Sequence, residues 1–419
     1  MKLPEIYNYL SFSLEEGRIK INCIRRKSNF CEKNNDFLLS FIGNPFIKSS
    51  DYNFHEIINL SFCIKKYKES LNNLASSIDG SFLIIFVDYK SGLIHIINDR
   101  FGAFPFFYNE DFSGIFGSIH SDEVGSKILN KDIDLTSLAE FVRTGTISPT
   151  FSFYKEVRSL DYGNILTFDI ERKNVEIQKY FNPSEISNEK YSSLEEAYNG
   201  LLFGMKYIKN RYINYFKEIG LLLSGGVDSR SIAIFFKNKC EALSLSSFNN
   251  RSKRITKKIA FLLGIKLEFI SFEYKEYIRF FEESVFLSGG VSSFIENHFA
   301  NPEIISKLKR YDLLISGCYF DYAFKGLTTN TKFFKILGIR LPLLVESSRK
   351  LYFYKKDFDI ENSLQCLVDK RRSNRYKNIK DKNSLEFERV APLYLECDYI
   401  GRRSLFMFTN WNAFVANNI

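Results

Sequence analysis

Residues 220–230 read Gly-Leu-Leu-Leu-Ser-Gly-Gly-Val-Asp-Ser-Arg, and this stretch decides the fold of the second half of the chain. The apolar run 221–223 predicts a strand, and the apolar segment 231–236 predicts a helix soon after it. Two adjacent glycines, Gly225 and Gly226, let the backbone approach an anion closely. Such a turn aims several backbone N–H groups at one point, where the helix N-terminus adds partial positive charge. The stretch therefore predicts a phosphate-binding turn between a strand and a helix.

The polar side chains of this turn suit a phosphate group that carries a metal ion. Ser224 and Ser229 supply hydroxyl donors, and Arg230 is a candidate either to contact phosphate or to pair with an acid. Asp228 alone would repel phosphate, but it is explained if it binds Mg²⁺, which bridges to phosphate oxygens. The turn is not a Walker A loop, because the pattern G-x-x-x-x-G-K-[ST] is absent. An ordinary glycine-rich turn is the alternative.

Length and composition predict a globular chain of two domains. The chain has 419 residues, of which 45% are hydrophobic and 26% charged, as is typical of soluble proteins. Its net charge of +9 leaves anionic partners open, although short basic runs are usually solvated surface. Seven cysteines without a CxxC pair favour neither a disulfide framework nor a zinc knuckle, and we expect a reducing, cytoplasmic compartment. No apolar run approaches ~20 residues, so no membrane span is expected.

Strands alternate with helices after residue 219, which predicts a parallel α/β sheet with ligands at the carboxyl ends of its strands. One long helix is predicted first, over 194–216. The elements expected after the glycine-rich turn are a strand at 243–248, a helix at 255–263 ending at Gly264, a strand at 266–272, a helix at 277–287 and a strand at 313–317.

The first 182 residues predict strands joined by turns. The clearest feature is a hairpin, made by a strand at 81–88, a turn ending at Gly92 and a strand at 93–98. The other expected elements are strands at 115–119 and 160–168 and a helix at 134–142, with Asp134 as its N-cap. The polar run 183–198 predicts a linker. The expected domains are therefore 1–182 and 199–419.

Several short motifs, in order, resemble the N-terminal, glutaminase-type domain of asparagine synthetases. Asp79-Gly-Ser-Phe82 matches the family's DG-x-F strand start, and Asp99-Arg-Phe-Gly102 with Pro105 matches its DRFG-x-x-P turn. Tyr162-Gly163 and Tyr180 match two later positions. The resemblance covers about residues 78–182. It implies an antiparallel β-sandwich of two sheets flanked by helices, of the N-terminal-nucleophile (Ntn) glutaminase type.

The N-terminus departs from the active members of that family. Their residue after the initiator Met is a cysteine, whose α-amine acts as base and whose thiolate attacks glutamine. Lys2 stands at this position, and the first cysteine is Cys23. Gly43-Asn44 is the nearest counterpart of the family's Asn-Gly-Glu glutamine-binding segment. We therefore expect no glutaminase activity and a structural or docking role for this domain.

The second half resembles the ATP pyrophosphatases, whose pyrophosphate-binding loop reads like residues 224–229. Ser316-Gly-Cys-Tyr-Phe-Asp321 resembles the Ser-Gly-x-Gly-x-Asp motif of asparagine and β-lactam synthetases, with Tyr319 in place of the second glycine. The implied fold is a doubly wound parallel sheet of the adenine-nucleotide α-hydrolase type. The implied ATP-binding residues are Ser224, Gly225, Gly226, Asp228, Ser229, Arg230, Ser246 and Gly317. The implied Mg²⁺ ligands are Asp228 and Asp321, and the catalytic candidates are these two residues and Glu296, which falls where the family builds its substrate pocket.

The resemblance implies an ATP-dependent amide ligase. Such an enzyme activates a carboxylate as an acyl-adenylate, releases pyrophosphate and AMP, and here takes its amine from ammonia or from the substrate itself. The expected partners are ATP, Mg²⁺ and a small carboxylate or a peptide; a homodimer is left open and nucleic acid is not expected. The family's catalytic lysine cannot be placed, which leaves open a shortened or altered C-terminal part. The alternatives are a non-catalytic or regulatory ATP-binding homologue and, less favoured, a tRNA-modifying ATP pyrophosphatase.

Overall fold

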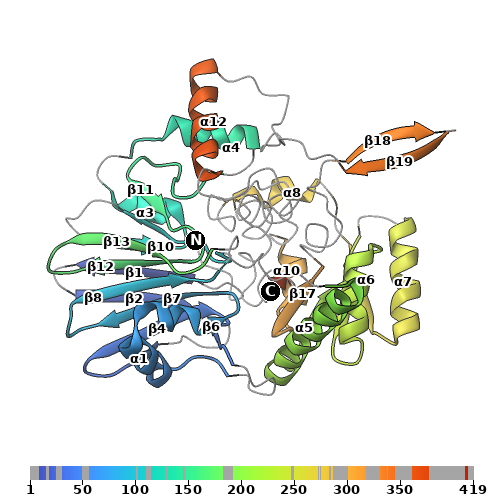
Figure 1. Cartoon of the computed structure of the whole chain (residues 1–419), viewed down its shortest axis with the longest axis horizontal. Coiled ribbons are helices and arrows are strands. Elements are labelled where there is room, and N and C mark those ends of the chain that lie inside the picture. The colour runs from blue at the N-terminus through green and yellow to red at the C-terminus, as the bar shows by residue number, and fades with distance from the viewer. Residues whose placement is uncertain are drawn as a thin grey trace.

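The computed structural model of the chain describes most residues up to 317 and four shorter segments beyond it. The described residues are 9–15, 18–24, 31–49, 56–100, 102–109, 115–128, 131–144, 147–182, 192–246, 250–271, 273, 275–282, 285, 301–317, 331–336, 338–344, 361–376 and 411–413. They form an antiparallel β-sandwich from the first part of the chain and a parallel sheet with its helices from the second part (Figure 1).

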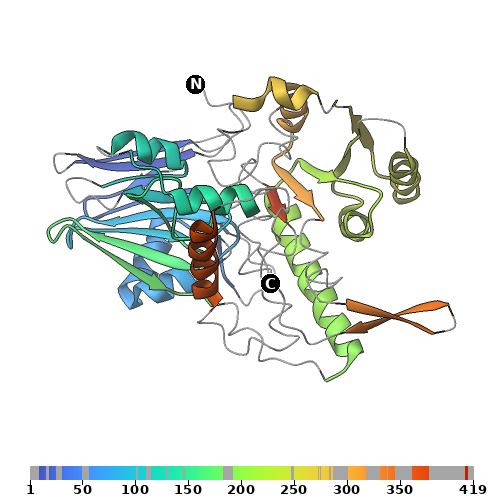
Figure 2. The ribbon, with the colours of Figure 1, turned by 90° about the horizontal axis from the view of Figure 1, so that it is seen from above.

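Two antiparallel sheets build the sandwich (Figures 1 and 2). The first has the strand order β11-β9-β10-β1-β2, with bounds Val157–Ser159, Phe107–Asn109, Phe116–Ser118, Tyr9–Glu15 and Arg18–Ile24. The second has the order β13-β12-β8-β7-β4-β3, with bounds Asn174–Lys179, Asn164–Asp169, Leu93–Asn98, Phe82–Asp88, Phe37–Gly43 and Cys31–Lys33. Two short strands, β5 (Phe46–Ile47) and β6 (Ile78–Asp79), pair with each other.

Helices cover the outer faces of both sheets. Helices α1 (Leu60–Glu69) and α2 (Leu71–Ser76) pack on the second sheet, where Leu74 shares a buried cluster with Phe86. Helix α3 (Ser121–Lys127) packs on the first sheet. An antiparallel strand with one wet face would alternate apolar and polar residues. Every residue of β7 is instead buried, because this strand has neighbours on both faces. The sandwich flanked by helices is thus present.

The second part is a five-stranded parallel sheet with the order β16-β15-β14-β17-β20. The strand bounds are Leu267–Ile270, Glu241–Leu245, Ile219–Leu222, Leu313–Ser316 and Trp411–Ala413. The helices around it are α5 (Leu194–Tyr215), α6 (Val227–Phe236), α7 (Arg251–Leu263), α8 (Glu276–Arg279) and α10 (Pro302–Leu308).

Helices cover both faces of this parallel sheet. Leu221 and Ile315 belong to one buried cluster with Ile232 of α6 and with residues of α5 and α7. Leu314, next to Ile315 on β17, belongs to another cluster with Ile304 of α10. Successive side chains of a strand point to opposite faces, so α6 and α10 lie on opposite sides of the sheet. A parallel sheet with helices on both faces fits the predicted α/β class.

Two predicted boundaries shift in the structure. Helix α6 begins at Val227 rather than at 231, because Gly226 in an extended conformation caps it and Asp228 in the first turn favours the positive end of the helix. Helix α5 begins at Leu194, as the predicted helix 194–216 does, so the last five residues of the predicted linker 183–198 belong to this helix. The predicted helix 277–287 is represented by α8, which has four residues. The hairpin β18 (Thr331–Ile336) and β19 (Ile339–Leu344) was not anticipated.

A buried arginine joins the two parts of the molecule. Arg211 of α5 is 1% exposed, and its Nη2 lies 3.5 Å from Oδ2 of Asp79 in β6. Arg100, beside the sandwich, lies 3.0 Å from the other oxygen of Asp79. The Arg211 guanidinium also lies over the ring of Phe46, 5.2 Å from its centre. Since α5 leads into the parallel sheet, these contacts hold that sheet against the sandwich.

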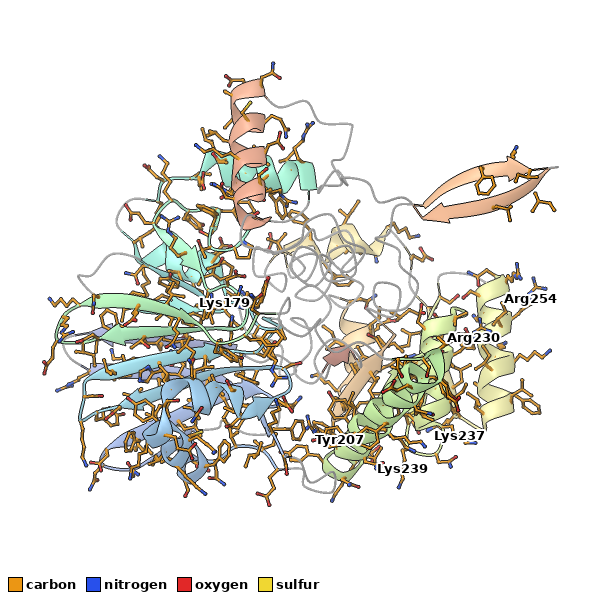
Figure 3. The ribbon with its side chains drawn as sticks, viewed as in Figure 1. Lys179, Tyr207, Arg230, Lys237, Lys239 and Arg254 are labelled. Atoms are coloured by element: carbon orange, nitrogen blue, oxygen red, sulfur yellow. The ribbon has the colours of Figure 1, made fainter. Side chains whose placement is uncertain are left out.

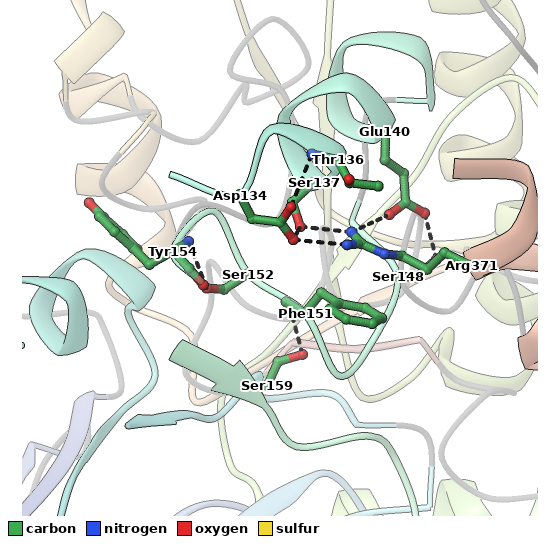
Figure 4. Close-up of polar contacts among 10 residues, drawn as sticks. All are labelled: Asp134, Thr136, Ser137, Glu140, Ser148, Phe151, Ser152, Tyr154, Ser159 and Arg371. Atoms are coloured by element: carbon green, nitrogen blue, oxygen red, sulfur yellow. Dashed lines mark hydrogen bonds and ion pairs between the residues drawn. The ribbon is translucent and has the colours of Figure 1, made fainter. Parts of the chain in front are cut away.

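A second contact joins helix α12 (Asn362–Tyr376) to helix α4 (Leu135–Thr144) (Figure 4). Arg371 donates to Ser137 and to Oδ2 of Asp134, both at 2.8 Å, and its guanidinium lies 3.7 Å from the centre of the Phe151 ring. Arg372 Nε donates to Oε1 of the fully buried Glu140 at 2.7 Å. Residues near the end of the chain are therefore anchored on the sandwich side.

Among the helices that the structure describes, including the 22-residue α5, none combines the length and the apolar run that a transmembrane segment requires.

Candidate functional site

The parallel sheet changes its direction of growth at β14. From β14 the chain adds β15 and β16 on one side, and it later adds β17 on the other side. Open α/β sheets bind ligands in the crevice at such a switch point, beyond the carboxyl ends of the strands. The turn 224–229 follows β14, and Gly317 directly follows β17. Both predicted motifs therefore begin at the switch point.

Hydrogen bonds within the glycine-rich turn fix its conformation. The Ser229 Oγ accepts from the backbone N–H of Ser224 at 3.0 Å and lies 3.0 Å from the Ser224 Oγ. The Ser224 Oγ in turn accepts from the N–H of Gly226 at 3.2 Å. Ser229 is buried, whereas Ser224 is exposed. Ser229 therefore shapes the turn, and Ser224 is the more accessible hydroxyl.

Gly225 is packed against the first turn of α7. A Cβ at this position would lie 2.7 Å from the Ser252 Oγ and 3.0 Å from the Ser252 Cα. The Gly225 N–H donates to that Oγ at 3.1 Å. Ser252 is a site residue that the sequence prediction missed, because it started this helix at 255. The signal for the earlier start of this helix was Asn250. Its side chain caps α7 by accepting from the N–H of Lys253, as asparagine commonly does at a helix start.

Gly317 brings the two predicted motifs into contact. A Cβ here would lie 2.8 Å from the backbone nitrogen of Ser229 and 3.0 Å from the Cβ of Asp228. Real Cβ atoms do not approach other atoms this closely, so any side chain would push the end of β17 away from the first turn of α6. The glycine is therefore required for the close approach of these two segments, whatever ligand they bind.

Positive potential gathers at the same edge of the sheet. The N-terminus of α6 is capped by Gly226 without a side-chain hydrogen bond, and Arg230 Nε donates back to the Gly226 carbonyl at 3.1 Å. The first residues of α7 include three basic residues and no acidic one: Arg251, Lys253 and Arg254. Arg230 and Arg254 are labelled in Figure 3. Basic side chains are disfavoured at a helix N-terminus, so this arrangement favours an anionic ligand.

The remaining predicted site residues divide into two groups. Ser246 follows β15 at the same edge of the sheet, and its N–H donates to the carbonyl of Ile270 at 3.0 Å. Asp228 is half-buried in the first turn of α6. Asp321 and Glu296 lie outside the described residues, so the predicted pair of carboxylates is represented by Asp228. Within the described part of the chain, no three His, Cys, Asp or Glu side chains converge as a metal-binding group.

The motifs of the sandwich have structural contacts. The buried Asp99 accepts from the N–H groups of Phe82 at 3.1 Å and Ala103 at 2.9 Å, and so ties two of the predicted motifs together. The hydroxyl of Tyr180 donates to the carbonyl of Asn98 at 2.7 Å. Burial raises the pKa of Tyr180 well above its usual value. These residues fix the turns of the domain.

The described cysteines of the sandwich are buried or lie in strands. Cys23 lies in β2, is 8% exposed and donates its thiol hydrogen to the carbonyl of Phe41. Burial raises the pKa of Cys63 above its usual range and that of Cys240, in the second part, to about 12. The thiolate is the nucleophilic form, so these side chains are poor nucleophiles. Lys2 lies outside the described residues.

Comparisons with solved structures give weak overall matches. An allosteric regulatory enzyme of purine biosynthesis matches with a TM-score of 0.27 and 9% identity, over 63% of this chain and 74% of that one. A glutamine-dependent NAD⁺ synthetase from Acinetobacter baumannii matches with a TM-score of 0.23 and 15% identity, over 56% of this chain and 41% of that one.

Sequence comparisons are more specific. Residues 49–181 match the glutamine amidotransferase domain family. Glutamine-hydrolysing asparagine synthetase 2 of Bacillus subtilis is 26% identical over 233 residues, which are 50% of this chain and 30% of that protein. Putative asparagine synthetases 2 and 1 of Methanocaldococcus jannaschii are 25% and 21% identical, over 44% and 62% of this chain and 36% and 47% of theirs. The matched part thus spans less than half the length of these relatives. Together with the ordered motifs, these matches support membership of the asparagine synthetase family, at low sequence identity.

Proposed function

We propose that this chain is an ATP-dependent amide ligase of the asparagine synthetase type. In this reaction a carboxylate oxygen attacks the α-phosphorus of ATP and pyrophosphate leaves. An amine then attacks the acyl-adenylate carbonyl, and AMP leaves with formation of an amide. The observation that carries the proposal is the contact of Gly317 with the first turn of α6, because it brings residues of the two motifs together at the switch point.

The chain's own residues have separate proposed roles. The N-terminus of α6 and the Ser224 hydroxyl bind the pyrophosphate and stabilise the charge that develops as it leaves. Ser229 holds the turn in shape through its hydrogen bonds to Ser224. Arg230 and the basic first turn of α7 add positive charge beside the phosphates. Ser246, at the end of the neighbouring strand, lies on the side proposed for the adenosine.

Asp228 fits a magnesium ligand by its chemistry and position. It offers carboxylate oxygens, which Mg²⁺ prefers, beside a turn that favours phosphate. Asp321 is the proposed second ligand. When bound, Mg²⁺ would neutralise phosphate charge at this edge of the sheet. Glu296 is proposed to contact the substrate.

The proposed amine donor is ammonia or an amine of the substrate. Cys23 lies within a strand, so its backbone nitrogen is in a peptide bond and is not a free amine. It therefore cannot act as an N-terminal nucleophile. The raised pKa values of Cys31 and Cys63, caused first by burial, disfavour their thiolates. A glutamine-dependent reaction would contradict this part of the proposal.

Pyrophosphate and AMP release from Mg·ATP tests the proposal. The protein is given aspartate, other carboxylates or peptides, with ammonia or glutamine, and isotope exchange between pyrophosphate and ATP is followed in parallel. Asp228→Ala and Asp321→Ala are expected to abolish release. Asp132→Ala, at an exposed ion pair on the sandwich, is the matched control and should behave as wild type.

Three results would count against the proposal. Release that needs no carboxylate would indicate a simple ATPase, and unchanged release in Asp228→Ala would remove the proposed site. Tight ATP binding without release on any substrate would favour a non-catalytic homologue. A dependence on tRNA would favour the modifying pyrophosphatase instead.

A further inference from the structure

The hairpin of β18 and β19 is a two-stranded sheet of its own. Its strands pair from Thr331↔Leu344 to Ile336↔Ile339, and within the described residues neither strand has another neighbour. Figures 1 and 2 both show it projecting from the molecule. A lone two-stranded hairpin is marginally stable in water. Its two backbone edges pair with no other strand that the structure describes and can therefore pair with a strand of another chain.

One face of the hairpin is apolar and exposed at the end near its turn. Phe334 is paired with Leu341 and Ile336 with Ile339, and alternation along each strand puts all four on the same face. Their exposed fractions are 41%, 40%, 50% and 63% in that order. Such a row is unfavourable in water, and it suits apolar side chains from a partner.

The charge of the hairpin is of one sign. Residues 331–344 include Lys332, Lys335 and Arg340 and contain no aspartate or glutamate. The register places Lys335 opposite Arg340, and like charges directly opposite each other destabilise a strand pair. Acidic side chains on a partner would relieve this repulsion. The charge therefore favours an acidic partner.

The two edges differ in what they can bind. Proline has no N–H and is found in sheets with its nitrogen toward solvent, so Pro342 removes a donor from the free edge of β19. Strand β18 contains no proline and keeps its full set of backbone donors and acceptors. The free edge of β18 is therefore the better position for an added strand.

Two other partners fit less well. A stable dimer buries about 800 Å² per subunit, with roughly 20–30 residues a side, whereas this hairpin offers two strands of six residues. An anionic bilayer would match the charge, but it would leave the edge N–H and C=O groups without partners in an apolar medium. An added peptide strand satisfies both the charge and the backbone edge.

We propose that the free edge of β18 docks an extended segment of a polypeptide substrate in which acidic and apolar side chains alternate. The hairpin begins at Thr331, 14 residues after Gly317 of the proposed ATP site, so it is inserted into the segment that leaves that site. The inference rests on the proposed function, because the docked polypeptide segment is a substrate only if this chain is a ligase that acts on peptides.

Peptide binding without nucleotide tests the inference separately from the ligase reaction. Fluorescent peptides of alternating Glu and Val, of alternating Lys and Val, and of Glu and Val interrupted by proline are titrated into the full chain. Hydrogen exchange of residues 331–344 is followed at the same time. The Glu–Val peptide is expected to bind and to slow exchange in β18. Lys335→Glu should weaken it by roughly tenfold, and Ile339→Ser should weaken it as well. Ile177→Ser, at a 43% exposed position on β13, is the matched control.

Four outcomes would contradict the inference. Equal binding of the Glu–Val and Lys–Val peptides, or unchanged binding in Lys335→Glu, would overturn the inference. So would sedimentation of the wild type, but not of Ile339→Ser, with vesicles of anionic lipid, or a dimer that Ile339→Ser dissociates. Because the assay contains no ATP, a failure here is distinct from a failure to release pyrophosphate.

Discussion

Replacement of Glu140 by alanine should detach α12 from the sandwich. Glu140 is fully buried. Its carboxylate accepts a hydrogen bond from the Ser148 hydroxyl at 2.5 Å and forms ion pairs with Arg372 at 2.7 Å and with Arg371 at 3.5 Å. The alanine variant would leave two arginines, whose side chains are 11% and 13% exposed, without this carboxylate. Removing one partner of a buried ion pair typically costs about 3–5 kcal/mol.

The expected cost lies at the low end of that range. Arg371 keeps its contacts with Asp134 and Ser137, so only part of the network is lost. About 3 kcal/mol corresponds to roughly a hundredfold change in the opening equilibrium of α12. Burial would raise the pKa of Asp134, but hydrogen bonds from Ser137 and Arg371 and the charge of Arg371 lower it overall. Asp134 therefore stabilises the contact above the usual aspartate pKa, and this contribution is lost as the pH falls through the lowered value.

Amide hydrogen exchange of residues 362–376 measures the opening directly. Glu140→Ala should lower their protection by roughly a hundredfold, and Glu140→Gln should lower it less because the amide keeps part of the hydrogen bonding. Glu69→Ala, which breaks the partly exposed pair with Lys66, should change stability by about 0.2–1 kcal/mol and leave α12 unaffected. Protection of α12 in Glu140→Ala within a few-fold of wild type would refute the reasoning.

Two further predictions concern the site and the pH dependence. Gly317→Ala, whose Cβ would lie 2.8 Å from the Ser229 nitrogen, should destabilise the protein by roughly 1–3 kcal/mol and lower pyrophosphate release, as measured by denaturant unfolding and by the release assay. Gly204→Ala in α5, where nothing lies within 4 Å, should instead stabilise by roughly 0.5–1 kcal/mol, and a similar loss in both variants would contradict the packing argument. Burial lowers the pKa of His95 from 6.5 to about 4, so its contribution to stability is complete above pH 6.5 and falls as the pH drops toward 4, by roughly 3 kcal/mol. In His95→Gln the unfolding free energy should vary less over this pH range, and an unchanged pH profile would show that His95 does not titrate in this way.

Local patterns in the sequence predicted the elements that build the switch point. The apolar runs at 221–223 and 313–317 gave strands close to those observed, since buried parallel strands are continuously apolar. The glycine-rich turn was also located correctly. The start of α6 was placed four residues late, because Val227 to Arg230 look like a polar loop and only the extended Gly226 shows that they form the first helical turn.

Long-range contacts account for what the sequence did not predict. Nothing near Ser252 indicates that its hydroxyl meets the N–H of Gly225, 27 residues earlier. Likewise, the burial of Arg211 depends on Asp79, which lies in the other part of the molecule. A basic residue in a helix is usually solvated, and no local pattern distinguishes this one. The roles of Asp321 and Glu296 in the site stay predictions.

The position of strand β20 in the sequence determines when the parallel sheet can be completed during synthesis. It pairs with β17 through Leu314↔Trp411, Ile315↔Asn412 and Ser316↔Ala413, so β17 gains this neighbour only after residues 411–413 have been made. The 97 residues from Gly317 to Ala413 take roughly 5–20 s to synthesise. During that interval β17, which Gly317 directly follows, lacks its β20 neighbour and can pair with other polypeptides. The proposed nucleotide site is thus completed only after residue 413 has been made, and its assembly depends on a segment that contributes none of the proposed ligand-binding residues.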